Sequence, residues 1–165
     1  IDRLAKDGDP AAHAFPRGLG GEGGGRALKP ENKYNFSFSG VKTAVLYHCL
    51  GKNTSKRELE MVEYEPPFVA DVAASFQEAV VDVLVAKTIR AAEREQVRSV
   101  ILGGGVAANS RLRERLNEEA ERAGLALKIA PRHYCTDNAS MIAGYAWHLL
   151  REGRVAPLNV EASPR

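Results

Sequence analysis

The chain of 165 residues has a net charge of +2, with 44% hydrophobic and 27% charged residues, which is typical of one globular domain or of one and a half. No apolar stretch approaches the ~20 residues that a membrane span needs, and no signal peptide opens the chain. Two cysteines, Cys49 and Cys135, without a CxxC motif favour a reducing compartment, so a cytoplasmic protein without a membrane partner is expected. Because the chain begins at Ile1 rather than Met, we expect a fragment or a processed piece.

The first third of the chain mixes glycine-rich and periodic segments. Residues 1–5 predict a short helix or the end of one, and residues 8–33 predict a flexible glycine-rich loop. Large and small side chains alternate over residues 34–39, which predicts a strand, and a helix over 41–50 should follow it. Residues 55–58 have the spacing of a capping box and are compatible with the start of another short helix.

An alternation of helices and strands fills the rest of the chain. Apolar residues at three- and four-residue steps predict one long helix over 68–95. A buried strand over 98–102, a charged helix over 110–123, a strand over 126–129 and a last helix over 138–152 should follow. This order predicts the α/β fold class, with a parallel or mixed layered sheet. Ligands of such sheets bind at the C-terminal ends of the strands.

The most informative run is Val100–Ser110, in which three apolar residues meet three glycines before a helix begins. Glycines there allow the backbone to approach a ligand closely, and the helix N-terminus suits an anion, so the run is a candidate nucleotide wall. The alternative, a tight turn without a ligand, is equally compatible with the local pattern. Residues 18–23 match G-x-G-x-x-G but follow no strand and open no helix, so we interpret them as loop.

Two polar residues lie just before predicted helices, and each has two interpretations. Asp137 could cap the last helix, or it could be a metal or substrate ligand. Asn109 could cap the helix over 110–123, or it could bind a ribose or a base. One carboxylate cannot hold a transition metal alone, and the chain has no HExxH or HxxxH motif, so a self-contained metal site is not expected.

Most of the arginine and histidine side chains discussed next are expected to have structural rather than ligand-binding roles. Arg111, Arg113 and Arg115 are interpreted as a solvated helix face rather than as a phosphate clamp. His13 and His133 are expected at the surface. The remaining two histidines are expected at packed or solvated helix positions, and these are His48 and His148. Ser37, Ser39 and Lys42 flank a strand-to-helix turn that could touch a ligand.

Four segments in this order resemble one family along nearly the whole chain, from Ile1 to about Gly153. They are Phe36-Ser-Phe-Ser-Gly-Val-Lys-Thr-Ala44, Asp71-Val-Ala-Ala-Ser-Phe-Gln77, Gly103-Gly-Gly-Val-Ala-Ala-Asn-Ser-Arg-Leu-Arg113 and Cys135-Thr-Asp-Asn-Ala-Ser-Met-Ile-Ala143. The chain resembles the C-terminal half of the tRNA adenosine threonylcarbamoyltransferase family, once labelled O-sialoglycoprotein endopeptidases, in its bacterial form.

The resemblance implies an actin/Hsp70/sugar-kinase-like (ribonuclease H-like) fold, of which residues 1–153 would form one lobe and residues 154–165 a tail. It implies transfer of a threonylcarbamoyl group from its adenylate to N6 of adenosine 37 in tRNAs that read codons beginning with A. Asp2, Gly104 and Asn109 match positions that bind the adenylate or ATP, and Asp137 matches a ligand of one divalent metal ion, iron or zinc.

The resemblance also implies parts that this chain does not contain. The family's two metal-binding histidines lie upstream of the position that matches Ile1, so the chain alone is expected to be inactive. The implied partners are tRNA, an inactive paralogue of the same fold and a small P-loop ATPase. Basic side chains that could meet tRNA include Lys52, Lys56, Arg57 and the face from Arg111 to Arg115. Alternatives are a non-catalytic nucleotide-binding scaffold of the same fold and, least supported, a peptidase.

Overall fold

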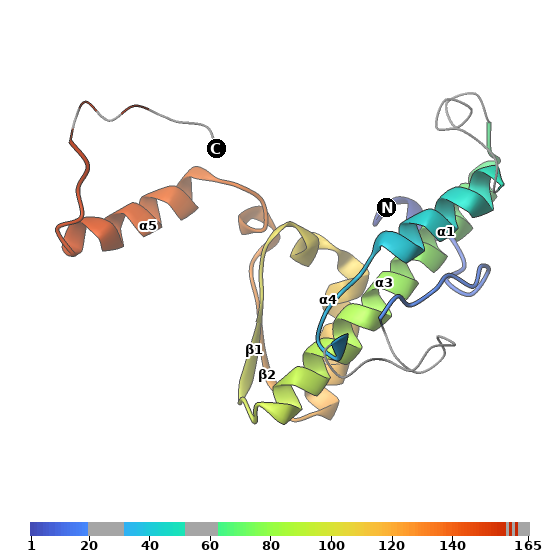
Figure 1. The fold of residues 1–165 in the computed structure, drawn as a ribbon, viewed down its shortest axis with the longest axis horizontal. Helices are drawn as coiled ribbons and strands as arrows, with labels where there is room; N and C mark the ends of the chain where they lie inside the picture. The colour runs from blue at the N-terminus through green and yellow to red at the C-terminus, as the bar shows by residue number, and fades with distance from the viewer. Residues whose placement is uncertain (20–31, 52–62, 158, 160, 162–165) are drawn as a thin grey trace.

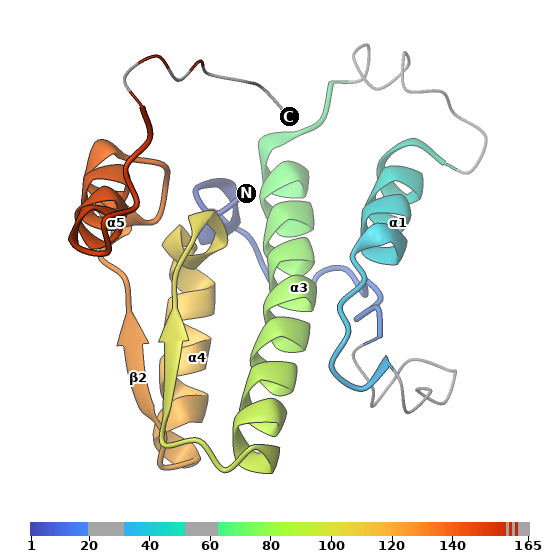
Figure 2. The ribbon, with the colours of Figure 1, turned by 60° about the vertical axis from the view of Figure 1, so that its left-hand side comes forward.

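The helix α3, Pro66–Arg94, is the longest element, and α1, η1 and α4 pack along it (Figures 1 and 2). The computed structural model describes residues 1–19, 32–51, 63–157, 159 and 161. The other elements, with η for 3-10 helices, are η1 (Leu4–Asp7), α1 (Ser39–Leu50), β1 (Ser99–Leu102), η3 (Gly105–Ala108), α4 (Ser110–Arg122), β2 (Ala126–Ile129), η4 (Arg132–Tyr134) and α5 (Ala139–Arg151). The four longer predicted helices are therefore confirmed, with bounds that shift by at most two residues.

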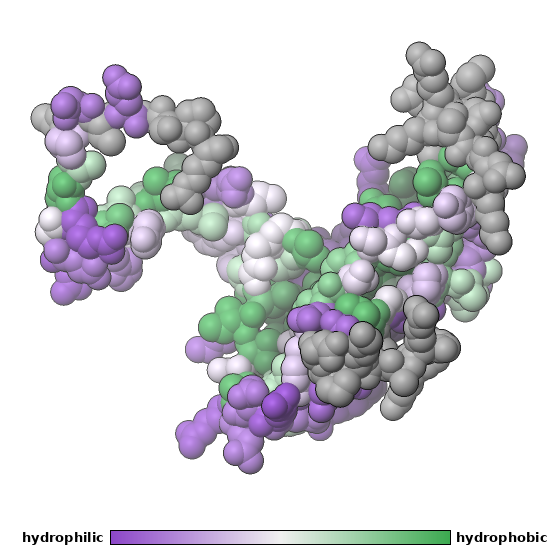
Figure 3. Space-filling model, in the orientation of Figure 1, coloured by the Kyte–Doolittle hydropathy of each residue, from purple (hydrophilic) through white to green (hydrophobic). Residues whose placement is uncertain are grey.

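The two strands are parallel neighbours, which confirms the predicted α/β class. Ser99 pairs with Ala126 and Leu102 pairs with Ile129, and α4 provides the crossover that parallel strands require. The prediction of a buried first strand is wrong, because 76% of Ile101 is exposed. Leu102 and Leu127 pack toward α3 and α4, whereas no described element covers the opposite face of the sheet. Figure 3 shows hydrophobic surface in this region.

Among the residues that the structure describes, the core is divided into three clusters, and α3 contributes to all of them. The cluster between α3 and α4 contains Val81, Val85, Leu112 and Leu116. The cluster between α3, α1 and the N-terminal segment contains Phe15, Val41, Val72 and Ala79. The cluster under η1 contains Ala5, Ala73 and Ala74, where small side chains allow close approach. One helix thus aligns the N-terminal segment with α4, although these are separated by about a hundred residues.

The N-terminal segment packs on α3 as far as the structure describes it. The predicted helix over 1–5 is found four residues long and slightly later, as the 3-10 helix η1. Residues 8–19 have no regular structure, as expected, yet Phe15 is buried and the amide of Asp9 donates to Asp71 Oδ1 at 2.8 Å. Residues 20–31, which contain most of the G-x-G-x-x-G match, and the capping-box residues 55–58 lie outside the described residues.

The strand predicted over residues 34–39 is absent, and the segment is irregular until α1 begins. Its main chain meets a side chain of α3 instead of a neighbouring strand. Lys87 is 1% exposed, and its Nζ donates to the carbonyl oxygens of Asn32 and Asn35 while lying 5.6 Å from the ring centre of Phe36. Burial lowers the pKa of the Lys87 ammonium. The segment is therefore joined to α3 by the hydrogen bonds of Lys87 rather than to a sheet by strand pairing.

The last helix, α5, extends away from the rest of the fold (Figures 1 and 2). None of its residues is buried, Leu149 is half-buried, and the other large hydrophobic side chains are exposed. These are Met141, Ile142, Tyr145, Trp147 and Leu150. Within the described residues, no helix has both the length and the apolar character to cross a bilayer.

Candidate nucleotide-facing site

The glycine run and the segment before α5 meet at one edge of the sheet. The strands β1 and β2 end there, and the amide of Ala130 donates to the carbonyl of Leu102 at 2.9 Å. The glycine turn, Gly103–Gly105, leads into η3 and is exposed to solvent. Gly104 has a φ of +84°, a conformation that side chains with a Cβ rarely adopt. A Cβ at Gly105 would lie 3.9 Å from the carbonyl oxygen of Cys135, so the two loops are neighbours.

Asn109 caps α4, which confirms one of its two interpretations. Its Oδ1 accepts a hydrogen bond from the amide of Leu112 at 2.9 Å. Its Nδ2 donates to Oε1 of Gln77 on α3 at 2.7 Å. The side chain is half-buried, and these two bonds fix its orientation next to the glycine turn. Sequence reasoning did not single out Gln77, although it ends one of the motifs that carry the resemblance.

Asp2 lies at the same helix N-terminus, 108 residues away in sequence from its partner. Its Oδ1 accepts from the amide of Ser110 at 3.0 Å, and its Oδ2 accepts from the hydroxyl of Ser110 at 2.9 Å. A carboxylate is favourable there because the first amides of α4 are free donors at the positive end of the helix dipole. Asp2 binds Ser110, and Asn109 is the residue just before it. The two residues that are expected to face the nucleotide therefore lie together at the start of α4.

A pocket of about 520 Å³ opens beside Asp2 and Ser110. Its charged lining includes a bidentate ion pair, in which Nε and a terminal nitrogen of Arg111 donate to Glu78 at 2.7 and 2.9 Å. The Arg111 guanidinium holds the pKa of the Glu78 carboxyl below its usual range, and Glu78 in turn raises the pKa of Arg111. The pair joins the first turn of α4 to α3 and thereby fixes the wall of the pocket.

The expected solvated arginine face is wrong. Arg111 and Arg115 keep only 31% and 28% of their side chains exposed, and Arg113 is also half-buried. Arg111 pairs with Glu78, and Arg113 donates to main-chain carbonyls. The interpretation failed because Glu78 lies on another helix, 33 residues away, and because the carbonyl acceptors of Arg113 belong to η3 and to the residue after β2. This face consequently offers few unpaired cations to a polyanion such as tRNA.

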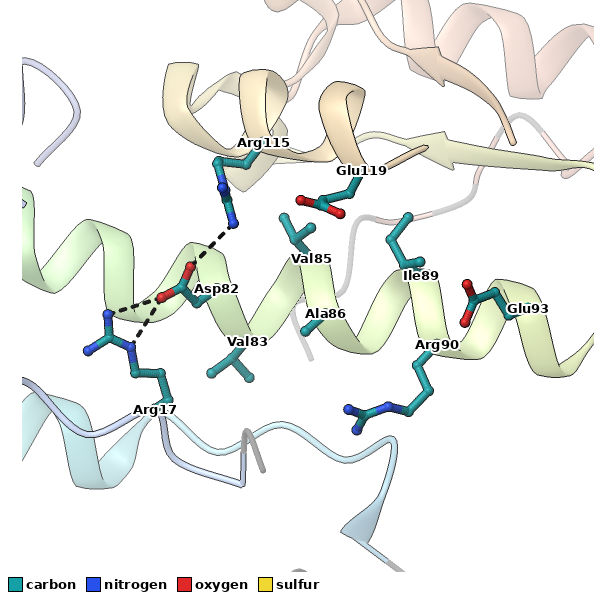
Figure 4. A pocket seen from close by; sticks show the side chains of 10 residues that line it. All are labelled: Arg17, Asp82, Val83, Val85, Ala86, Ile89, Arg90, Glu93, Arg115 and Glu119. Carbon is teal, nitrogen blue, oxygen red and sulfur yellow. Dashed lines mark hydrogen bonds and ion pairs between the residues drawn. The ribbon is translucent and has the colours of Figure 1, made fainter. Parts of the chain in front are cut away.

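A second pocket, of about 500 Å³, lies farther along the α3–α4 interface (Figure 4). Asp82 occupies its end, where it accepts from Nε and a terminal nitrogen of Arg17 at 3.1 and 3.0 Å. Arg115 approaches the other Asp82 oxygen at 3.7 Å. Figure 4 shows both guanidinium groups pointing at this one carboxylate from different segments. These groups join the N-terminal segment, α3 and α4, which is a structural role.

Asp137 does not cap α5, because Asn138 does so by accepting from the amide of Met141 at 3.1 Å. Asp137 is exposed immediately before that cap, and it forms no hydrogen bond or ion pair with another described residue. In the part of the chain that the structure describes, no group of three or more His, Cys, Asp or Glu side chains could hold a metal ion. Asp137 is therefore an exposed carboxylate on the loop before α5, and its role as a metal ligand stays a prediction.

The histidines do not enter this site. His133 is exposed, as expected. The expectation for His13 is wrong, since it is half-buried and packs against His48 and Phe68 with ring centres 4.4 and 5.6 Å away. His148 is exposed on α5. The hydrophobic segment around Phe15, which follows His13 closely, explains why this histidine is drawn onto α1 and α3.

Comparisons with known proteins agree with this arrangement of motifs. The family model described as TsaD, tRNA N6-adenosine threonylcarbamoyltransferase, matches residues 1–144. A curated relative of that name from Thermotoga neapolitana is 45% identical over 164 residues, covering 99% of this chain and 44% of the relative. Another of the same name, from Chlorobium phaeobacteroides, is 42% identical over 165 residues, covering 99% of this chain and 45% of the relative. The chain thus spans less than half the length of these relatives, and it belongs to the tRNA N6-adenosine threonylcarbamoyltransferase family.

Proposed function

We propose that this chain forms one wall of the active site of a threonylcarbamoyltransferase that modifies N6 of adenosine 37 in tRNA. The observation that carries the proposal is the meeting of Asp2, Asn109 and Ser110 at the start of α4, beside the exposed glycine turn. The wall would belong to one of two actin-like lobes that close on threonylcarbamoyl-adenylate or ATP. The inactive paralogue and the small P-loop ATPase are proposed as protein partners in a cytoplasmic assembly.

The chemistry of this wall favours the ribose part of the ligand over its phosphate. The Asp2 carboxylate already occupies the α4 N-terminus and would repel a phosphate there. Carboxylate oxygens accept from hydroxyl groups, so Asp2 and the Asn109 amide suit a ribose. The glycine turn, without side chains, leaves room for the flat base or the phosphate to approach the main chain. We therefore assign orientation of the adenylate, rather than bond making, to these residues.

Asp137 is proposed as one ligand of a shared divalent metal ion. The donor set in the described residues fits a shared site and does not fit a complete one, because a catalytic metal needs about three protein ligands. When bound, such an ion would supply Lewis-acid polarisation of the carbonyl to be transferred. Asp137 contributes a carboxylate, and its position is set by the loop that the buried Cys135 anchors in the fold.

The test uses an extended protein, defined as this chain preceded by the part of the Thermotoga neapolitana transferase that it does not match. Purified extended protein, together with the proposed paralogue and P-loop ATPase partners, is given threonylcarbamoyl-adenylate labelled in the threonine and unmodified tRNA. It should transfer label to tRNA, and this chain alone should transfer none. Clear turnover by the chain alone would contradict the one-wall assignment, and no transfer by the extended protein would contradict the proposed activity.

Single substitutions in the extended protein assign the roles. Asn109→Ala and Asp2→Asn should weaken use of the adenylate, whereas Asn117→Ala, an exposed asparagine on the same helix, should have no effect. Asp137→Ala should abolish transfer, with Glu121→Ala as its exposed acidic control. Full tRNA modification by the Asp137→Ala protein would contradict the role of Asp137 as a metal ligand, whereas absence of transfer by the unsubstituted extended protein would favour the non-catalytic scaffold.

A further inference from the structure

Arg113 connects the three segments that make up the edge of the sheet. Its Nε donates to the carbonyl oxygen of Ala107 in η3 at 2.5 Å. One terminal nitrogen donates to the carbonyl oxygen of Ala130, just after β2, at 2.6 Å, and to Sγ of Cys135 at 3.2 Å. Arg113 itself lies one turn into α4, so a single guanidinium spans the glycine loop, the strand end and the loop that leads to Asp137.

The acceptors of Arg113 are main-chain carbonyls and a thiol rather than a carboxylate. This distinguishes it from Arg111 and Arg115, which pair with acidic side chains of α3. Hydrogen bonds from a charged donor are about twice as strong as neutral ones, and a planar fork fixes directions as well as distances. Ala107 and Cys135 are both buried, at 0% and 3% exposure, so the contacts lie in a region where water competes poorly.

We propose that Arg113 is a positioning residue that holds the Asp137 loop against the nucleotide-facing glycine loop. The inference rests on the proposed function for its catalytic meaning, but the physical link itself is independent of it. Without the guanidinium, the carbonyls of Ala107 and Ala130 lose their charged donor, and Cys135 loses its contact with α4. The two loops could then move relative to each other, although the residues that each loop contributes to the site would be unchanged.

The link is tested directly in this chain by hydrogen exchange followed by mass spectrometry. In Arg113→Ala, amides of residues 103–109 and 130–137 should exchange at least about tenfold faster than in the wild type, because local opening loses several hydrogen bonds. Amides of residues 79–92 in α3 should exchange at the wild-type rate. Arg122→Ala is the matched control, since Arg122 lies on the same helix, keeps 66% of its side chain exposed and, in the described structure, pairs only with Glu119.

Unchanged exchange in both loops would overturn the proposal, as would an equal increase in α3, which would indicate general destabilisation. Arg113→Lys keeps the charge but cannot bridge all the acceptors, so it should accelerate the same two loops to a smaller extent. This variant decides the question if the alanine variant fails to fold.

The effect of Arg113 on catalysis is tested in the extended protein. Arg113→Ala should lower kcat for threonylcarbamoyl transfer by at least about tenfold while KM for the adenylate changes less than about threefold, because ligand contacts remain but their alignment with Asp137 is lost. Equal loss in the Arg122→Ala control, or a change in KM alone, would contradict the positioning role. If the wild-type extended protein transfers nothing, the proposed function fails, while the exchange data still decide whether Arg113 links the loops.

Discussion

Replacing Glu78 with Gln should destabilise the fold much more than the same replacement of Glu114, although both carboxylates bind Arg111. Glu78 accepts two hydrogen bonds, at 2.7 and 2.9 Å, and keeps only 15% of its side chain exposed. Glu114 accepts one at 2.7 Å and is 58% exposed. The comparison holds the cation constant, so it isolates the effects of burial and of bidentate geometry.

The expected magnitudes follow from these exposures. Hydrogen bonds to charged groups contribute about 1.5–3 kcal/mol when partly buried, and exposed ion pairs contribute about 0.2–1 kcal/mol. Glu78→Gln should therefore cost about 2 kcal/mol and Glu114→Gln about 0.5 kcal/mol or less. In a chain of this size, a loss of about 2 kcal/mol lowers Tm by about 4–8 °C.

The effect should also depend on pH with a definite sign. Arg111 lowers the pKa of Glu78 in the folded state, so the ion pair stabilises the fold fully above the ordinary glutamate pKa of about 4.3. That stabilisation is lost as the pH falls through the lower pKa of the folded state. The difference in unfolding free energy between the wild type and Glu78→Gln should thus shrink in acid.

Urea unfolding followed by circular dichroism measures these differences at neutral pH and at several acidic values. Glu114→Gln serves as the matched control in every series. Equal losses for the two variants at neutral pH would refute the argument from burial. If the loss of unfolding free energy in Glu78→Gln stayed constant into strong acid, the assignment of the pKa shift to this ion pair would be refuted.

Three further changes test other parts of the fold. Leu116→Ala should cost about 3 kcal/mol in urea unfolding, because Leu116 is 2% exposed between α3 and α4, and a loss below about 1 kcal/mol would contradict that packing. Gly104→Ala should lower stability by about 1 kcal/mol more than Gly103→Ala, since neither new Cβ meets an atom within 4 Å but only Gly104 has a positive φ; equal melting temperatures would contradict this. Gly8→Ala should release the N-terminal segment from α3, because its Cβ would overlap the carbonyl of Ala70, and proteolysis of that segment should accelerate; an unchanged cleavage rate would contradict the close approach.

Local patterns in the sequence were sufficient for the helices and for the two strands. Apolar spacing predicted α3 within two residues, and an apolar run that ends in glycines predicted β1. The strand over residues 34–39 failed because its conformation is decided by Lys87, more than fifty residues away. Such an override cannot be seen in a short window, since alternation is compatible both with a sheet and with a loop packed on a helix.

The site was less predictable than the fold. Spacing alone left Asn109 as either a cap or a ligand, and only the resemblance pointed to Asp2, whose contact with Ser110 spans 108 residues. Arg111 was misinterpreted because its partner Glu78 lies on another helix. The charge pattern of one helix predicts ion pairs within that helix. It does not predict ion pairs with another helix, because these depend on how the helices pack.

The open face of the β1–β2 sheet affects how this chain must be handled in solution. A two-stranded sheet leaves main-chain donors and acceptors along its outer edges, and Ile101 adds apolar surface beside them. Such edges pair with other chains, and salts that are excluded from protein surfaces strengthen apolar association. Dilute protein at low concentrations of such salts is therefore the condition under which unfolding and exchange measurements report on a single chain.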